Sequence, residues 1–445
     1  MADVDPEQTP SLTPRSSAEQ EQTAKRSLWG DQNFMLLWAG QSISEVGSSI
    51  SFLALSLVAV NLLNASPFEI GLLAMSATLP YLLVSLHAGV IVDRRAKRQI
   101  MIACDVGRFL FIGSIPLVTI PGLGLHLTYI HLLAVSFLAG ILTVFFDVSY
   151  QSYLPTLLRQ EELVEGNGKL GTTQSFAHFA GPAIGGALVG LVGAARAITV
   201  DAISYVVSAA SLLLIRNPEP VSEPRVEGPG MRHEIAEGLN FVIRHPILRK
   251  IIACTATSNL FSAMGFALEV IFLIRILQAS PSVVGVVFSA SALGGIIGGL
   301  VAGRLSKSIG SARIIWFSII VLGLPTFMIP LAQPGLGIVL YVTGRFFFVA
   351  MAVVYNVAQI SYRQLITPPE MLGRMNASAR FITWGAAPIG AALGGVLGST
   401  IGIRPTLWVA MTGVWAAGLW VLCSPLRKMR DIQIHESGML KDSVG

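Results

Sequence analysis

The chain has 445 residues, of which 53% are hydrophobic and 12% are charged, and its formal net charge is +5. Soluble domains carry about 25% charged residues, so the composition excludes a protein that faces water over most of its surface. The mean hydropathy of +0.67 agrees with this conclusion. The basic residues are scattered over many segments, which argues against a nucleic-acid-binding surface.

Polar stretches stand at both ends of the chain and hydrophobic runs fill most of the length between them. Residues 1–32 are rich in Ser, Thr, Pro, Glu and Gln, a composition typical of disorder. We therefore expect a disordered cytoplasmic tail at 1–32, a six-helix bundle at 33–216, a linker at 217–250, a second six-helix bundle at 251–425 and a cytoplasmic tail at 426–445.

Twelve hydrophobic runs are long enough to cross a bilayer, which requires about 20 apolar residues per helix. The expected spans are 34–62, 69–92, 99–120, 128–155, 169–193, 197–215, 251–277, 283–303, 313–332, 337–362, 375–401 and 405–424. The predicted fold class is an all-α membrane protein with twelve transmembrane helices.

The basic residues predict the orientation of these helices. Of the 30 Lys and Arg residues, 24 fall in the two tails and in every second connection between spans. Connections rich in Lys and Arg remain in the cytoplasm. The sequence therefore predicts a multi-pass protein of the cell (inner or plasma) membrane, with both termini in the cytoplasm.

Two parts of the chain repeat each other. Gly299 opens a segment that resembles the one opened by Gly89, 210 residues earlier, and Glu370 stands 209 residues after Glu161 in a second matching pair. A membrane protein with two similar halves usually has its binding site between them. We therefore expect two pseudo-symmetric six-helix bundles and the function of a carrier.

Residues 217–250 interrupt the hydrophobic pattern between the two halves. They begin with Asn217-Pro218-Glu219-Pro220, which is typical of a linker. Residues 234–245 then place apolar residues at helical spacing with charges between them, which predicts a short helix on the cytoplasmic membrane face. The segment is either a tether that lets the bundles move relative to each other or a passive connector.

These features together resemble the major facilitator superfamily. Gly89-x-x-x-Asp93-Arg94-x-Ala96-Lys97-Arg98 is similar to that superfamily's signature loop between spans 2 and 3, with Ala96 where a second glycine is usual. The resemblance extends over residues 33–425 and implies the major facilitator fold.

A second motif resembles one branch of that superfamily. Gly181-Pro182-x-x-Gly185-Gly186 in span 5 is similar to the core of a motif associated with exporters that exchange their substrate for protons. Further matches to the branch of macrolide-efflux and enterobactin-export proteins are Leu154-Pro155, Asp201-Ala202, Gln364-x-x-Thr367-Pro368 and Gly373-Arg374. The resemblance implies export, whereas the fold alone identifies no substrate.

Glu45 is the first proton-coupling candidate. A carboxylate near the middle of a span costs about 3 kcal/mol or more, and therefore tends to face a cavity. In the resembled branch an acidic residue often follows the glycine, but this chain has Ser48 after Gly47. Glu45 stands one turn earlier on the same helix face and is expected to replace that acid. The alternative is a carboxylic acid hydrogen-bonded to a neighbouring helix.

Asp147 in span 4 is the second proton-coupling candidate. The repeat relates it to Asn356 in span 10, which lies 209 residues later. Two polar positions related in this way should face each other across a central cavity; a polar anchor near the cytoplasmic mouth is the alternative for Asp147. Further candidates to line the cavity are Gln41, Tyr150, Gln174 and Trp384.

Two arginines within spans lead to different expectations. Asp105 and Arg108 stand three residues apart, so we expect them to form a structural ion pair along one helix. Arg345 in span 10 has no local acidic partner, and a guanidinium group cannot lose its charge. Arg345 either meets an acid from another span or contacts an anionic group of the substrate.

Charged residues at the cytoplasmic side predict a latch between the halves. Asp93 follows span 2 and should approach Arg374 at the start of span 11, where a helix N-terminus attracts an anion. By the repeat, Arg304 follows span 8 and should approach Glu165 at the start of span 5. We expect both pairs to form when the cavity opens outward; the alternative is that the charges only face water. The residues expected to take part in gating are Gly89, Asp93, Arg94, Arg98, Glu165, Arg304 and Arg374.

The sequence predicts a secondary active efflux transporter that uses alternating access and proton antiport. Its substrate is expected to be an amphipathic antibiotic, siderophore or related metabolite. We expect no enzymatic activity, cofactor or metal site, because the three cysteines and seven histidines lack metal-ligand spacing. The expected partners are the substrate, protons and the bilayer, and the protein is expected to be a monomer. A proton-coupled nutrient importer and a polytopic membrane enzyme are the alternatives.

Overall fold

The structure is a computed structural model that describes residues 28–159, 162–216, 231–368 and 371–431. Within these ranges it contains twelve helices that are long and apolar enough to cross a membrane, which confirms the predicted fold class. Most of both expected tails lies outside the described residues. The end of the first tail is ordered, because Leu28–Gly30 forms a 3₁₀ turn and Asp31 accepts the N–H of Phe34 at 2.9 Å as a helix cap.

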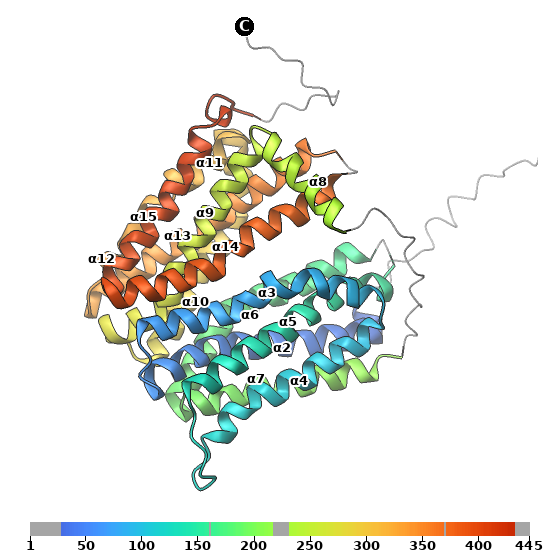
Figure 1. The fold of residues 1–445 in the computed structure, drawn as a ribbon, viewed down its shortest axis with the longest axis vertical. Helices are drawn as coiled ribbons and strands as arrows, with labels where there is room; N and C mark the ends of the chain where they lie inside the picture. Colours follow the sequence, from blue (N-terminus) through green and yellow to red (C-terminus); the bar gives the residue numbers. More distant parts are fainter. Residues whose placement is uncertain (1–27, 160–161, 217–230, 369–370, 432–445) are drawn as a thin grey trace, which may run out of the picture.

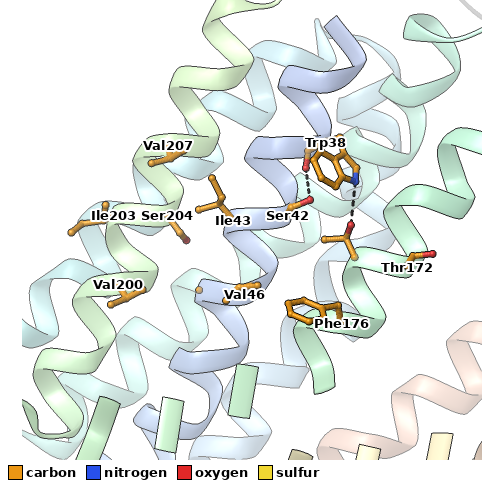
Figure 2. A pocket seen from close by; sticks show the side chains of 12 residues that line it. Trp38, Ser42, Ile43, Val46, Thr172, Phe176, Val200, Ile203, Ser204 and Val207 are labelled. Carbon is orange, nitrogen blue, oxygen red and sulfur yellow. Dashed lines mark hydrogen bonds between the residues drawn. The ribbon is translucent and has the colours of Figure 1, made fainter. Parts of the chain in front are cut away.

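Six spans form the N-terminal half. They are α2 (Gln32–Leu57, continued by a π-helical turn at Val58–Leu62), α3 (Pro67–Asp93), α4 (Lys97–Val118), α5 (Tyr129–Leu157), α6 (Leu163–Val192) and α7 (Ala194–Leu214). α2 packs against both α6 and α7 (Figure 2). α3 starts with a capping box, in which Ser66 and Glu69 each accept the other's backbone N–H.

The C-terminal half contains the remaining spans and one shorter helix. Its elements are α8 (Met231–Arg244), α9 (Leu248–Ile271, continued by a π-helical turn at Phe272–Ile276), α10 (Pro281–Ile309), α11 (Arg313–Ile320), α12 (Met328–Leu331), α13 (Ile338–Ile366), α14 (Leu372–Thr400) and α15 (Ile403–Leu422). α11 and α12 form one span that is interrupted near Pro325, because proline cannot donate the hydrogen bond that a continuous helix needs.

The number of residues that separates equivalent positions of the two halves takes two values, which we call the two registers of the repeat. The last three spans of each half begin 209 residues apart, as expected, since α5, α6 and α7 correspond to α13, α14 and α15. The first two spans follow an offset of 214, which relates the end of α2 at Leu57 to the end of α9 at Ile271, and Pro67 at the start of α3 to Pro281 at the start of α10. The expected position of Arg304 is therefore wrong. α10 continues to Ile309, so Arg304 lies within this helix rather than after it.

The two halves touch on the side of the membrane opposite the one where α2 begins and α15 ends. We call the side where the halves touch the far side, and the side where α2 begins and α15 ends the terminal side. Toward the far side, the N–H of Ala183 on α6 donates to Ser289 Oγ on α10 at 3.0 Å, and the rings of Phe52 and Phe266 stack with centroids 5.3 Å apart. Figure 1 shows α3 and α14 side by side at one end and diverging toward the end where α8 lies.

The linker helix α8 packs on the C-terminal half. Val242 is buried against Ile252, Met375 and Ala379, at the starts of α9 and α14. Part of the apolar face that was expected to lie on the membrane is therefore covered by protein. His245 joins α8 to α9, where its Nδ1 accepts backbone N–H groups, and burial lowers the pKa of its imidazole, which favours the neutral acceptor form.

Candidate functional site

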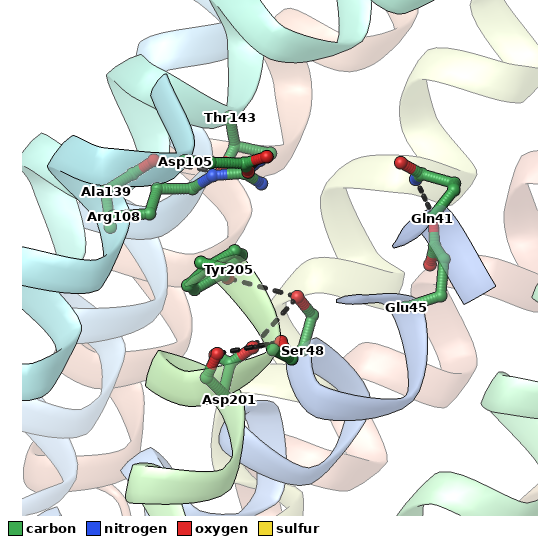
Figure 3. A network of polar contacts seen from close by, with 10 residues as sticks. Gln41, Glu45, Ser48, Asp105, Arg108, Ala139, Thr143, Asp201 and Tyr205 are labelled. Atoms are coloured by element: carbon green, nitrogen blue, oxygen red, sulfur yellow. Dashed lines mark hydrogen bonds and ion pairs between the residues drawn. The ribbon is translucent and has the colours of Figure 1, made fainter. Parts of the chain in front are cut away.

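Glu45 lies half-buried on α2. Its Oε1 accepts a hydrogen bond from Gln41 Nε2, one helical turn earlier, at 3.1 Å. Among the described residues, no basic side chain forms an ion pair with Glu45. Figure 3 shows Glu45 directed toward Gln41, whereas Ser48 on the same helix is directed toward α7. Glu45 therefore does not occupy the place of an acid that would stand at Ser48.

Asp147 is joined to the boundary between the halves through Tyr81. The hydroxyl of Tyr81 on α3 donates to Asp147 Oδ2 on α5 at 2.9 Å. The ring of Tyr81 also stacks on Trp384 of α14, with ring centroids 6.3 Å apart. The structure thus links a carboxylate of the N-terminal half to an aromatic side chain of the C-terminal half. Tyr150 is half-buried on α5, and its ring stacks on that of Phe146 with centroids 6.3 Å apart.

A buried polar cluster lies beneath Ser48. The Ser48 hydroxyl donates to Asp201 Oδ1 at 3.3 Å and lies 3.1 Å from the hydroxyl of Tyr205, both on α7 (Figure 3). Asp201 is only 1% exposed. Asp201 was expected only as part of a family motif, and its place in this cluster was missed. The rule that singled out Glu45, an acid inside an apolar span, also applies to Asp201.

The expected pair of Asp105 and Arg108 comes together on α4, where the two side chains form a buried ion pair. The guanidinium group lies over the rings of Phe146 and Tyr205, at 4.2 and 4.4 Å from their centroids. Cations are attracted to the faces of aromatic rings, most strongly away from water. The charge of the buried arginine is thus balanced within the N-terminal half, which is the arrangement expected of a structural pair.

Arg345 pairs with an acid from another span. Glu269 on α9 forms an ion pair with Arg345 and accepts a hydrogen bond from Tyr341 at 2.8 Å. Glu269 is 4% exposed and Arg345 is 8% exposed. The guanidinium group is thus engaged inside the C-terminal half, which corrects its inclusion among the substrate-contacting candidates. Glu269 was also missed, although it is an acid inside an apolar span.

Two other cavity candidates do not join the carboxylates. Gln174 is exposed on α6, and Asn356 is exposed on α13, where it accepts a hydrogen bond from Gln359 at 3.4 Å. The structure therefore gives no contact between Asn356 and Asp147, which the repeat relates to each other. In the part of the chain that is described, no three His, Cys, Asp or Glu side chains lie close enough to hold a metal ion.

Three of the gating residues have partners within their own halves. Arg374 pairs with Glu237 of α8 at 2.6 Å, and Glu165 pairs with Lys169 of its own helix at 3.2 Å. Arg98 donates to the carbonyl groups of Leu212 and Leu213 at the end of α7, where a cation is favoured by the helix dipole.

The side chain of Asp93 lies outside the described residues, and Arg304 and Glu165 do not pair with each other in this structure. Arg94 caps the end of α3, and a Cβ on Gly89 would meet no atom within 4 Å. The latch is expected in the opposite state, so it remains a prediction.

The glycines of the span 5 motif serve close helix packing. A Cβ on Gly181 would lie 2.4 Å from Ser49 Cβ, and one on Gly185 would lie 3.2 Å from Ile50 Cα, both on α2. A Cβ on Gly186 would lie 2.6 Å from the carbonyl oxygen of Pro281 on α10. The motif therefore packs α6 against α2 and, across the boundary, against α10. Pro182 contributes its carbonyl group to the same contact with α10.

Comparisons with known proteins agree with this architecture. The model of the transmembrane secretion effector family matches residues 27–443. The macrolide efflux protein A of Streptococcus pyogenes is 23% identical over 411 residues, which are 90% of this chain and 97% of that protein. The multidrug efflux pump Tap of Mycolicibacterium fortuitum is 26% identical over 357 residues, which are 77% of this chain and 84% of that protein.

Solved structures show the same fold. A bacterial homologue of the iron transporter ferroportin, in an inward-facing state, superposes with a TM-score of 0.69 at 15% identity and covers 89% of this chain and 99% of its own. A bacterial homologue of the human lysosomal transporter Spinster, inward-facing and unoccupied, gives a TM-score of 0.68 at 13% identity, with 88% and 96% covered.

The family match covers nearly the whole chain, and it confirms the resemblance to the efflux branch of the major facilitator superfamily. A polytopic membrane enzyme is thereby excluded. The chain belongs to the transmembrane secretion effector family and is an efflux-type major facilitator transporter.

Proposed function

We propose that this protein exports an amphipathic small molecule from the cytoplasm in exchange for protons. The observation that carries the proposal is the pair of carboxylates, Glu45 and Asp147, that have no ion-pair partner among the described residues. Asp147 reaches the boundary between the halves through Tyr81 and Trp384. A carboxylate in surroundings of low polarity is stabilised by whatever neutralises it, whether a proton or a cationic group of a substrate. If the proton and the substrate compete for the same carboxylates, the movement of one across the membrane is coupled to the movement of the other in the opposite direction.

The arrangement of the halves supports alternating access. Their contacts lie toward the far side, and α3 and α14 diverge toward the terminal side (Figure 1). The distribution of Lys and Arg supports cytoplasmic termini and a location in the cell membrane. The structure would then correspond to the state open to the cytoplasm. The latch pairs Asp93–Arg374 and Arg304–Glu165 are proposed for the opposite state.

The names of the relatives support a drug-like substrate. The two relatives described above are named for macrolide efflux and multidrug efflux. An antibiotic of that kind is therefore the first substrate to test, and siderophores and related metabolites are the next.

Proton release from inverted vesicles tests the proposal. Vesicles that contain the protein and a pH-sensing dye are given an acidic interior, and macrolides, catecholate siderophores and cationic drugs are added in turn. We expect one class to collapse the gradient with the wild-type protein, and we expect Glu45→Gln to reduce the rate at least tenfold because the proton-binding group is lost.

Glu69→Gln serves as the matched control. Glu69 is an acid on α3 at the far side, and a glutamine can also complete its capping box. This variant should therefore transport like the wild type. A gradient that no compound collapses, or collapse that is independent of both Glu45 and Asp147, would contradict proton antiport through these carboxylates.

A further inference from the structure

A groove runs along the outer surface of the N-terminal half, between α6 and α7, with α2 as its floor (Figure 2). Its volume is about 730 Å³, within the range of about 300–1,000 Å³ that small-molecule sites occupy. Its apolar walls are formed by Ile43, Val46, Phe176, Val200, Ile203 and Val207. Since these helices cross the membrane, the open side of the groove faces lipid.

The polar side chains of the groove are engaged inside the protein. Ser42 and Thr172 donate to backbone carbonyl groups four residues earlier, at 2.6 and 2.8 Å, and Ser204 donates to the carbonyl three residues earlier at 2.7 Å. Trp38 Nε1 donates to Thr173 Oγ1 at 3.1 Å, and Figure 2 shows the dashed line that leaves the indole nitrogen of Trp38. The groove therefore suits a hydrocarbon occupant, because such an occupant requires no hydrogen bonds from it.

The dimensions of the groove match one lipid chain. Its floor extends along α2 from Trp38 to Gly47, a rise of about 13 Å at 1.5 Å per residue. Half of a bilayer's hydrocarbon core is about 15 Å thick. The groove therefore spans most of one leaflet, starting from the terminal side of the membrane.

A basic and aromatic cluster lies at the terminal end of the groove. The Lys169 Nζ lies 3.9 Å from the centroid of the Trp29 ring, and Trp29 meets Trp38 edge-on with centroids 5.2 Å apart. Tryptophan favours the membrane–water interface, and a lysine at that level attracts an anionic lipid headgroup. Lys169 pairs with Glu165 at 3.2 Å, and the two side chains are 16% and 48% exposed. An ammonium group has three donors, so the part of it that remains exposed can donate to a further acceptor.

We propose that this groove binds one acyl chain of an anionic phospholipid from the leaflet on the terminal side. The chain lies on α2 between α6 and α7, and the phosphate group lies beside Lys169 and Trp29. Neither Glu45 nor Asp147 lines the groove, so the proposal does not rest on the proposed proton exchange.

The C-terminal half offers a matched control. Its corresponding groove, on α9 and α15, has a volume of about 540 Å³ and includes Val409, which the 209-residue register relates to Val200. The 214-residue register relates Gly47 to Phe261, whose ring lies against Gly413 in the floor of this groove. A glycine thus leaves the floor open in the N-terminal half, and a phenylalanine fills it in the C-terminal half.

The two grooves have similar chemistry at their terminal ends. In the C-terminal half Lys250 Nζ lies 4.9 Å from the centroid of a Trp420 ring. The proposal therefore predicts that the shape of the groove floor determines whether an acyl chain binds. It also predicts that the lysine determines whether the anionic headgroup binds. Only the N-terminal groove combines an open floor with a lysine at its end.

Photolabelling with a lipid probe tests the proposal on the full-length protein. The protein is reconstituted in phosphatidylcholine vesicles with a small fraction of phosphatidylglycerol that carries a diazirine midway along one acyl chain. After irradiation we expect labelled peptides from residues 38–47, 172–176 and 200–207. Val200→Trp fills the groove from a lipid-facing position and should lower this labelling at least fivefold, whereas Val409→Trp should leave it unchanged.

The headgroup is tested with Lys169→Gln. One lysine near a membrane surface contributes about 1 kcal/mol to binding an anionic lipid, so labelling by the phosphatidylglycerol probe should fall about fivefold. Labelling by a phosphatidylcholine probe of the same chain should not change. Equal labelling in the two tryptophan variants, labelling spread over all lipid-facing helices, or displacement of the probe by an exported drug would each overturn the proposal.

Discussion

The interiors of the two halves balance their charges in different ways. Away from its helix ends, the N-terminal half contains four acidic residues and one arginine: Glu45, Asp105, Asp147, Asp201 and Arg108. In the described spans of the C-terminal half, the only acid is Glu269, which pairs with Arg345. One half therefore retains carboxylates that can exchange partners, whereas the buried acid of the other has a fixed one. Under the proposed function, exchange would take place in the N-terminal half, and the ion pair of the C-terminal half would be structural.

The largest expected effect comes from removing the fixed acid of the C-terminal half. Glu269→Ala leaves the buried guanidinium of Arg345 without its ion pair, and breaking a buried pair costs about 3–5 kcal/mol. Asp147→Ala removes only the acceptor of the Tyr81 hydroxyl, which costs about 1–3 kcal/mol. Thermal unfolding of the detergent-solubilised variants should therefore show the larger decrease in stability for Glu269→Ala.

A double variant separates the loss of charge balance from the loss of packing. Combining Glu269→Leu with Arg345→Met removes both charges and should recover much of the stability, because apolar replacements of a buried pair are often neutral. Equal losses of stability in Glu269→Ala and Asp147→Ala would show that Glu269 is no more firmly paired than Asp147, and that the two halves do not differ in this respect.

An intermediate effect is expected at the boundary between the halves. A Cβ on Gly285 of α10 would lie 2.3 Å from the carbonyl oxygen of Pro182 on α6. The backbone of α6 cannot yield easily, so Gly285→Ala should disfavour the state closed at the far side by about 1–3 kcal/mol. Spin labels at the exposed residues Leu123 and Leu336 should then report a longer distance across the far side. Gly303→Ala on the same helix meets no atom within 4 Å and should not change that distance.

The smallest expected effect concerns the linker helix. Glu237 and Arg374 are 40% and 32% exposed, and partly exposed ion pairs contribute less than about 1 kcal/mol. Glu237→Gln frees Arg374 for the proposed latch with Asp93, so the fraction of molecules open at the far side should rise less than fivefold. The same spin labels at Leu123 and Leu336 measure this fraction.

A second substitution tests whether the latch is the cause. Adding Arg374→Gln to Glu237→Gln should return the fraction to its wild-type value, because the latch then lacks its arginine. A shift that persists in the double variant would count against the latch.

The spans were predictable because a bilayer requires long apolar runs, and the pair of Asp105 and Arg108 was predictable because it lies within one helix. Contacts between distant spans were not predictable in the same way. Nothing local to Arg345 indicates Glu269, which lies 76 residues earlier on α9. Asp201 and Glu269 could still have been chosen as candidates, since both are acids in apolar spans.

Two other differences have physical causes. The expected position of Arg304 was wrong because the offset of 209–210 residues holds only for the last three spans of each half, whereas 214 residues separate the starts of α3 and α10. The position of α8 could not be read from its amphipathic pattern, because an apolar face fits a lipid surface and a protein surface equally well.

The docking of α8 defines where the chain can be divided. Val242 is buried against residues of α9 and α14, so α8 belongs to the second half although it precedes the first span of that half. Two separately expressed polypeptides, ending at 216 and beginning at 231, would each contain a complete bundle. A division after Arg244 would instead leave Met375 and Ala379 uncovered on the second polypeptide. The first division is therefore the one from which hybrid transporters, with halves from different relatives, can be assembled.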